Sequence, residues 1–241
     1  MVRKLAALLS VALLCALPIA SHADSITYNA SGSDTDGPLS ASAAFTTSAG
    51  QVTLILSNTL AADVIRSAGQ ALSDITFTLS NNVGTFTEAI ATGQGGNVDG
   101  SGNLTYVSAP PGRWIGVGGG SFSASGETVS LEAIGGGQPT QMIIPFLADG
   151  GTYSNVNNGF KNFDPYEIGP VSFTFDLSGV TADTKITSAT FSFGTGPDKS
   201  LDGTPGVPTT PEPSSLVLLG TGLLGAAGAM RRRFLPGFKR G

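Results

Sequence analysis

Cysteine and histidine are almost absent from this 241-residue chain, which has one of each, Cys15 and His22, both near its N-terminus. The rest of the chain therefore cannot form a disulfide, a Cys or His zinc site, a Cys–His nucleophile or a Ser–His–Asp triad. A glycosidase could work with two carboxylates alone, but the local sequence singles out no pair of acids. We therefore expect no enzymatic activity.

Basic side chains are also scarce in the long central part of the chain. Residues 24–210 contain five Lys or Arg against sixteen Asp or Glu, a net charge of about −11. A surface with so strong an excess of acidic groups repels phosphate backbones and anionic lipid head groups. The composition therefore disfavours nucleic acid as a partner.

The N-terminal residues follow the pattern of a secretory signal peptide. Arg3 and Lys4 precede an uncharged apolar run over residues 5–17, and small residues follow up to Ala23. A short apolar run with a basic start and a small-residue end is the substrate of signal peptidase. The sequence predicts a signal peptide over residues 1–23, cleaved between Ala23 and Asp24.

A second apolar segment lies near the other end, over residues 214–230. Its flanking residues are Pro211, Glu212 and Pro213 before the segment and Arg231, Arg232 and Arg233 after it. At about 1.5 Å per residue the segment is just long enough for a short transmembrane helix, and the arginines favour a cytoplasmic location for the tail over residues 231–241. We expect an inner-membrane-anchored precursor with everything between the two apolar segments exported.

These C-terminal features together resemble the PEP-CTERM sorting signal, a tail that has also been labelled an ice-binding protein C-terminal domain. The resemblance covers about the last thirty residues, and the chain departs from many members by continuing over residues 234–241 after the arginines. It implies recognition of Pro211, Glu212 and Pro213 by an exosortase, a membrane transpeptidase. It also implies a Gram-negative bacterium that makes extracellular polysaccharide, with the mature protein at the cell surface or in the extracellular biofilm matrix.

The part between the two ends shows the alternation of apolar and polar residues that is typical of half-buried β-strands. The clearest strands cover residues 39–45, 52–56, 75–79, 129–133, 171–177 and 189–193. Asp-Gly and Asn-Gly pairs at 36–37, 99–100, 149–150, 158–159 and 202–203 suit tight turns between them. The sequence predicts an all-β, antiparallel β-sandwich or jelly-roll-like body over residues 24–203, one short helix within residues 61–72, and a Pro-rich spacer over residues 204–213.

Calcium is the only cofactor for which the residues offer ligands, because hard cations prefer oxygen donors. Asp34 and Asp36 precede a glycine, and Asn97, Asp99 and Asn103 lie in a loop with oxygen-bearing residues at alternate positions. The alternative is that both segments are ordinary turns. We otherwise expect no cofactor.

Four aromatic residues lie among polar neighbours and could form a carbohydrate-binding surface: Tyr106, Trp114, Tyr153 and Tyr166. The alternative is that their rings pack in the core, as aromatic rings usually do. The sequence thus favours a non-enzymatic structural or adhesive surface protein. A carbohydrate-binding module that attaches to extracellular polysaccharide is the alternative, and an ice-binding body is the third hypothesis.

Overall fold

The computed structural model describes residues 24–148, 151–196 and 199–206. The chain divides into two compact units, Met1–Val207 and Pro208–Gly241, and every described residue belongs to the first. Among the described residues, no helix has the length and apolar character needed to cross a membrane. The predicted signal peptide, transmembrane helix and basic tail lie outside this part of the chain.

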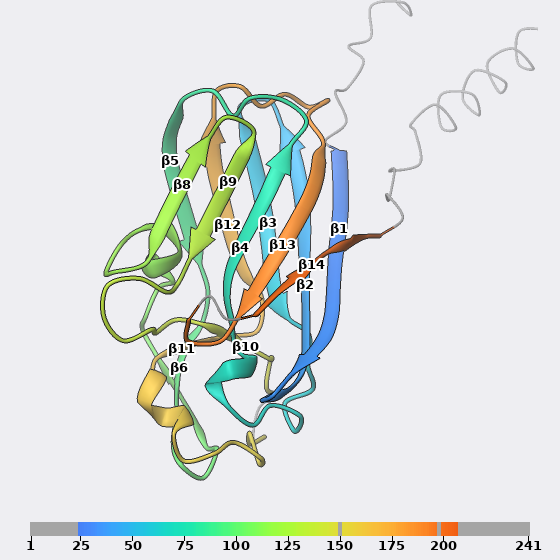
Figure 1. Ribbon diagram of the computed structural model, residues 1–241. Helices are drawn as coiled ribbons and strands as arrows, with labels where there is room; N and C mark the ends of the chain where they lie inside the picture. Colours follow the sequence, from blue (N-terminus) through green and yellow to red (C-terminus); the bar gives the residue numbers. More distant parts are fainter. Residues whose placement is uncertain (1–23, 149–150, 197–198, 207–241) are drawn as a thin grey trace, which may run out of the picture. The chain divides into compact units, whose positions relative to one another are not determined.

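Two β-sheets make up most of the first unit (Figure 1). The six-stranded sheet has the spatial order β15 (Thr204–Pro205), β1 (Asp24–Asp34), β2 (Gly37–Ser48), β3 (Gln51–Asn58), β12 (Val171–Leu177) and β5 (Phe86–Thr92). All of its neighbouring strands are antiparallel. Since β15 pairs with β1, the sheet continues beyond the predicted boundary at residue 203.

The nine-stranded sheet divides at its central strand, β4 (Leu72–Leu79). Its main path runs through β14 (Lys199–Asp202), β13 (Ile186–Phe193), β4, β10 (Ile143–Ile144), β11 (Tyr166–Ile168), β6 (Gly95–Val98) and β7 (Leu104–Val107). Residues 74–78 of β4 instead pair with β9 (Thr128–Glu132), which pairs with β8 (Ser121–Ser125). β10 and β11 are parallel, whereas the other pairs are antiparallel.

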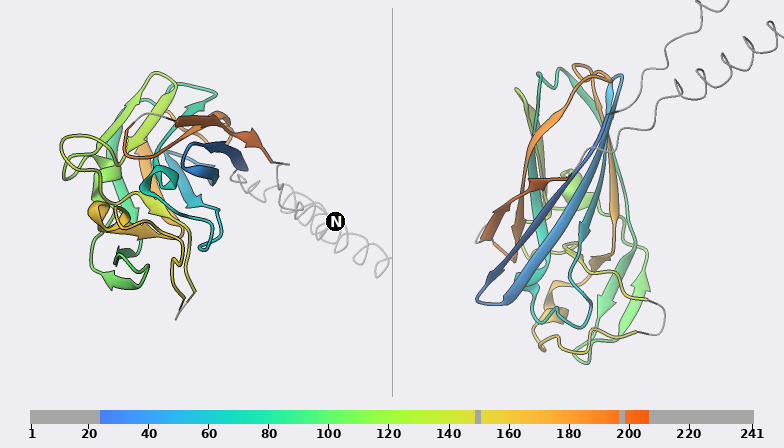
Figure 2. Two further views of the ribbon diagram at one scale, coloured as in Figure 1. Left: turned by 60° about the horizontal axis from the view of Figure 1, so that its bottom comes forward. Right: turned by 90° about the vertical axis from the view of Figure 1, so that its right-hand side faces the viewer.

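The core lies between the two sheets because the apolar residues of each strand alternate with polar ones. Phe45 on β2 meets Phe77 on β4 with ring centroids 4.8 Å apart, and Phe77 lies 6.4 Å from Phe175 on β12. A hydrogen bond also joins the two sheets: the hydroxyl of Tyr28 on β1 donates to the carbonyl oxygen of Ile186 on β13. The strands curve around this core (Figure 2).

The prediction of a mostly β body is confirmed, and each of the six predicted segments falls on a strand. The short helix predicted within residues 61–72 is present only as three residues of 3-10 helix. That segment forms turns and one short 3-10 helix, η1 (Ala68–Gln70), before β4 begins at Leu72. Ser67 caps η1 and Gln70 turns back to the backbone, so the segment meets its hydrogen-bonding needs without a longer helix.

Candidate functional site

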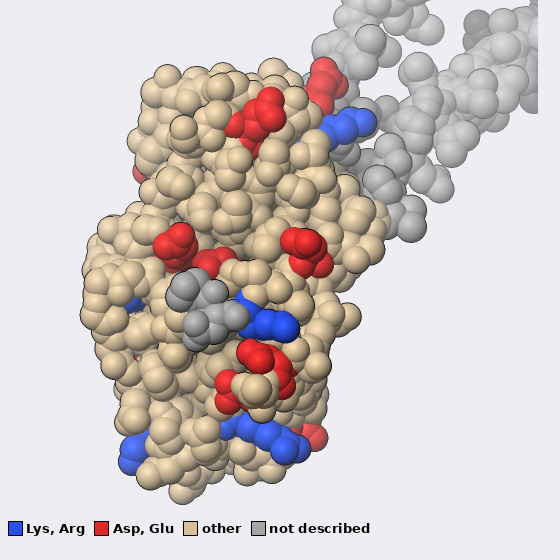
Figure 3. All heavy atoms as spheres, in the orientation of Figure 1, with Lys and Arg blue, Asp and Glu red and all other residues tan. Residues whose placement is uncertain are grey.

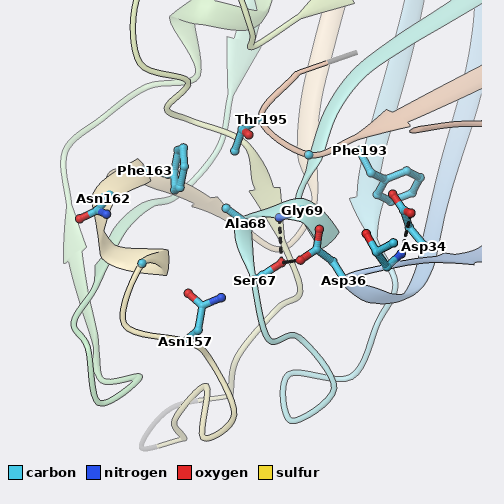
Figure 4. Close-up of a pocket in the computed structure, with 13 residues that line it drawn as sticks. Asp34, Asp36, Ser67, Ala68, Gly69, Asn157, Asn162, Phe163, Phe193 and Thr195 are labelled. Atoms are coloured by element: carbon cyan, nitrogen blue, oxygen red, sulfur yellow. Dashed lines mark hydrogen bonds between the residues drawn. The ribbon is translucent and has the colours of Figure 1, made fainter. Parts of the chain in front are cut away.

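A polar pocket of about 420 Å³ lies at one end of the β body (Figure 4). Four segments that are distant in sequence line it: the end of β1 with its hairpin turn, residues 67–69, residues 157–163 and residues 193–195. The third segment contains the 3-10 helix η3 (Phe160–Phe163). The pocket is therefore a product of topology, because the loops meet only when both sheets have formed.

A short chain of hydrogen bonds fixes one wall of this pocket. Asp36, in the turn between β1 and β2, accepts a hydrogen bond of 2.7 Å from the Ser67 hydroxyl, which in turn accepts from the Gly69 N–H at 3.1 Å. Buried Gln70 donates to the carbonyl oxygen of Pro38 at 2.9 Å and so joins η1 to the same hairpin. These hydrogen bonds fix the orientation of the Asp36 carboxylate at the pocket wall.

Gly69 is required for this close approach. A Cβ atom at this position would lie 2.1 Å from Oδ2 of Asp36, far inside van der Waals contact. Any side chain here would push the Asp36 carboxylate away from Ser67. The glycine that interrupts the predicted helix thus makes room for the carboxylate of the hairpin turn.

The side of the pocket opposite Asp36 carries Asn157, Asn162 and Phe163, as Figure 4 shows. Both asparagines are exposed, and the ring of Phe163 is half-buried against the core. The backbone N–H of Asn157 donates to the carbonyl oxygen of Arg66 at 2.7 Å, which ties this loop to the segment before η1. Carboxylate, amide and aromatic groups thus face one hollow, a combination that can hydrogen-bond and stack on a polyhydroxyl ligand.

The predicted calcium residues fall in two separate places. Asp34 and Asp36 line the pocket, where Oδ1 of Asp34 accepts from the N–H of Thr35 at 2.6 Å. Asp99 instead closes its own loop, accepting from the backbone of Ser101 and from both the backbone and the side chain of Asn103. These hydrogen bonds lower the pKa of Asp99.

The hydrogen bonds that Asp99 accepts are those of a tight turn. Asn97 lies on the neighbouring strand β6, where its side chain is exposed. Within the described ranges, no three His, Cys, Asp or Glu side chains gather as metal ligands. The structure therefore does not bring the predicted calcium residues together in one site.

Three of the four aromatic residues predicted to contact sugars are in the core, which corrects the expectation that their rings are exposed. Trp114, Tyr153 and Tyr166 are each 0% exposed. The indole N–H of Trp114 donates to the carbonyl oxygen of Gln141 at 2.6 Å, and each tyrosine hydroxyl donates to a backbone carbonyl oxygen. Burial raises the pKa of both tyrosines. Their polar neighbours belong to loops that fold over the core, so local polarity is a poor guide to exposure here.

Tyr106 differs from the other three because it is 46% exposed. It lies on β7, beside a groove of about 520 Å³ that is formed by residues 93–95 and 106–110. Of the four predicted aromatic residues, Tyr106 alone presents a ring surface to which a ligand has access.

Beneath this groove lies a buried carboxyl group that the sequence does not mark. Glu167 on β11 is 0% exposed, and among the described residues neither of its carboxyl oxygens has a hydrogen-bond partner. A Cβ atom on exposed Gly93 would lie 2.4 Å from its Oε2, so the glycine leaves space for the carboxyl group. Burial raises the pKa of Glu167 to about 8, which means that the folded protein holds this group protonated at neutral pH.

Comparison with known proteins identifies the C-terminal segment and nothing else. Residues 209–233 match the family model described as the PEP-CTERM protein-sorting motif. This segment contains Pro211, Glu212, Pro213 and the three arginines, and it lies outside the described residues. No curated protein and no solved structure matches the chain. The motif implies export and exosortase processing of a membrane-anchored precursor.

Proposed function

We propose that this chain is an exosortase-sorted surface protein, because it carries the PEP-CTERM protein-sorting motif. Its body is a non-enzymatic β-sandwich that serves a structural or adhesive role. The match at residues 209–233 carries the sorting part of the proposal. The composition supports the rest, since the described residues contain no Cys or His and only scattered acids. A body built mostly from sheets with hydroxyl-rich outer faces suits a passive component of an extracellular layer.

In the proposed pathway, signal peptidase removes residues 1–23 and the C-terminal helix halts transfer through the inner membrane. The arginines after residue 230 hold that end in the cytoplasm, and the exosortase then cuts at Pro211-Glu212-Pro213. The mature body reaches the cell surface or the extracellular polysaccharide of a Gram-negative host. Each step is assigned to a short, separate segment of the chain.

A substitution in the motif tests the sorting step. We expect Glu212→Ala to leave the protein in the inner-membrane fraction as an uncut precursor, whereas the native chain reaches the surface or the medium. Pro208→Ala is the matched control, because it changes the same Pro-rich approach one residue before the matched segment begins. Equal release of Glu212→Ala and the native protein would contradict the role assigned to the motif.

Carbohydrate binding is a second proposal, supported by the pocket that contains Asp36, Asn157, Asn162 and Phe163. Amides and carboxylates hydrogen-bond sugar hydroxyls, and a half-exposed ring stacks on the apolar face of a sugar. We expect a glycan array probed with residues 24–206 to show binding that Asn157→Ala/Asn162→Ala abolishes.

Asn97→Ala is the control, because Asn97 is an exposed asparagine outside the pocket, and it should leave the pattern of glycan binding unchanged. A pattern that the double variant does not alter would rule out this pocket as the sugar site. The ice-binding hypothesis has no separate support in the pocket, and the absence of thermal hysteresis would dismiss it.

A further inference from the structure

The groove beside Tyr106, formed by residues 93–95 and 106–110, has a buried carboxyl group directly behind it. Glu167 is 0% exposed, whereas Gly93 and Gln94 in the groove are exposed. A Cβ atom on Gly93 would lie 2.4 Å from Oε2 of Glu167, so this oxygen touches the inner side of a residue whose outer side meets solvent. The carboxyl group therefore points at the groove from below.

No described residue satisfies this carboxyl group. Within the described part of the chain neither oxygen has a hydrogen-bond partner, so no Lys or Arg there hydrogen-bonds to it. On the face shown in Figure 3, by contrast, Asp and Glu side chains reach the surface, some of them beside Lys or Arg, and water solvates them. Buried carboxylates in proteins are normally hydrogen-bonded, paired with a cation or bound to a metal ion. Glu167 thus calls for a partner that the described residues do not supply.

The strand next to Glu167 brings backbone oxygen atoms to the same place. Glu167 on β11 lies directly opposite Gly95 on β6, so their side-chain positions share one face of the sheet and are about 5 Å apart. A Cβ atom on Gly95 would meet the methyl group of Ala109 and, at 3.0 Å, its carbonyl oxygen, with the carbonyl oxygen of Val107 at 3.1 Å. The Val107 oxygen already accepts from the N–H of Ala109 at 3.1 Å, which makes the Ala109 oxygen the better ligand.

Gln141 fixes the loop that carries the Ala109 oxygen. Its side chain donates to the carbonyl oxygen of Pro110 at 2.7 Å. Its own backbone has a φ of 60°, in the left-handed region that residues other than glycine seldom adopt. The next residue, Met142, accepts from the N–H of Glu167 at 3.0 Å. A single residue in an unfavourable conformation thus joins the loop to the strand that carries the carboxyl group.

The chemistry of the groove favours a cation. Carboxylate and carbonyl oxygens are the ligands of hard cations, and the groove is lined by no Lys or Arg. Residues 24–210 carry sixteen acidic against five basic side chains, which attracts cations and repels anions. Burial raises the pKa of Glu167 to about 8, and a bound cation would favour the ionised form instead. Ca²⁺ suits irregular sites with loop carbonyls better than Mg²⁺, which demands near-octahedral geometry.

We propose that the Glu167 carboxylate and the carbonyl oxygen of Ala109 bind a divalent cation, preferably Ca²⁺, with water completing the coordination. Binding exchanges a proton for the ion: the O–H bond of the Glu167 carboxyl group breaks, the proton passes to water, and the carboxylate coordinates the ion. The ion ties β11 to the loop after β7 and so stabilises the body. This site shares no residue with the sugar pocket and uses none of the residues predicted for calcium from the sequence.

Calorimetric titration with CaCl₂ tests the site in residues 24–206, a segment with its own hydrophobic core. After removal of metal ions with a chelator, the native fragment should bind Ca²⁺ with a Kd on the order of 10⁻⁴–10⁻³ M and Mg²⁺ more weakly. Glu167→Gln keeps the shape of the side chain and removes its charge, so it should weaken Ca²⁺ binding about tenfold or more. Glu127→Gln makes the same change at an exposed residue and should bind as the native fragment does.

A second pair of variants decides the question if Glu167→Gln does not fold. Gly93→Ala places a methyl group 2.4 Å from Oε2 of Glu167 and should weaken binding by displacing the carboxyl group, whereas Gly136→Ala meets no atom within 4 Å and should not. Stability gives an independent measurement. Ca²⁺ at about 10 mM should raise the urea midpoint of the native fragment, followed by the fluorescence of Trp114, and leave that of Glu167→Gln unchanged.

Three results would overturn the proposal. The first is no binding by the native fragment up to about 10 mM CaCl₂, and the second is equal binding by the native fragment and Glu167→Gln. The third is loss of binding in Asp34→Asn/Asp36→Asn instead, which would place the ion at the turn before β2. Neither the sorting assay nor the glycan array depends on this ion site, so the outcomes of the three tests are separable.

Discussion

Replacement of Glu167 by glutamine should remove a large part of the pH dependence of folding. The carboxyl group is 0% exposed, no other described residue hydrogen-bonds to either of its oxygens, and burial raises its pKa from 4.5 to about 8. Because the folded pKa is above the unfolded one, the stabilising contribution of the bound proton is complete below pH 4.5. It is then lost as the pH rises through about 8.

The size of the effect follows from the two pKa values. Each pH unit between 4.5 and 8 costs about 1.4 kcal/mol, so the native protein should lose about 2.5 kcal/mol of unfolding free energy between pH 5 and pH 7 through this group alone. Glu167→Gln is neutral at both pH values and should not show this loss. Burial also raises the pKa values of Asp74 and Asp164 to about 6, and their smaller contributions remain in both proteins.

Urea unfolding at a series of pH values measures the effect directly. Trp114, the single tryptophan of the chain and fully buried, serves as the fluorescent reporter. Glu127→Gln is the matched control, because Glu127 is exposed and the same chemical change there should leave the pH profile as in the native protein. If Glu167→Gln and the native protein lose equal free energy between pH 5 and pH 7, the reasoning from burial is refuted.

Two further substitutions test the pocket wall and the core. Gly69→Ala should lower the free energy of unfolding, measured in urea, by about 1–3 kcal/mol because the added Cβ displaces Asp36 from Ser67. Gly136→Ala is the control and should be nearly neutral, since no atom lies within 4 Å of the added carbon. Equal losses in the two variants would contradict the close contact at Gly69. Trp114→Ala removes the fluorescent reporter, so its urea unfolding is followed by circular dichroism. It should cost about 3–5 kcal/mol as a core truncation, and exposed Tyr106→Ala less than about 0.5 kcal/mol; a small effect of Trp114→Ala would place the indole at the surface instead.

The strands with strict alternation could be predicted from the sequence because one face of each is buried. β12, and β4 from Ile75 onward, have large apolar residues at every second position, and the residues between them lie on the solvent side. Strand β1 is harder to predict, since its core-facing side chains include the small Ala30, which lies between Asn29 and Ser31. Period-2 alternation is weak wherever the buried residue is small.

The candidate site could be predicted only in part. Asp34 and Asp36 were recognisable as oxygen-bearing residues in a turn, but Ser67, Asn162 and Phe163 join them only through the topology of two sheets. No local pattern in the sequence indicates which loops will meet. Glu167 was likewise hidden, because an acidic residue between apolar neighbours usually faces solvent on a strand, and here Gly93 and the adjoining strands enclose it.

Mass spectrometry of the mature protein from its native host tests the sorting of this chain most directly. The account predicts a polypeptide that begins at Asp24 and lacks residues 231–241, with its new C-terminus at or near Pro211-Glu212-Pro213. Recovery of an exported, mature protein that still carries the intact segment from Arg231 to Gly241 would contradict it.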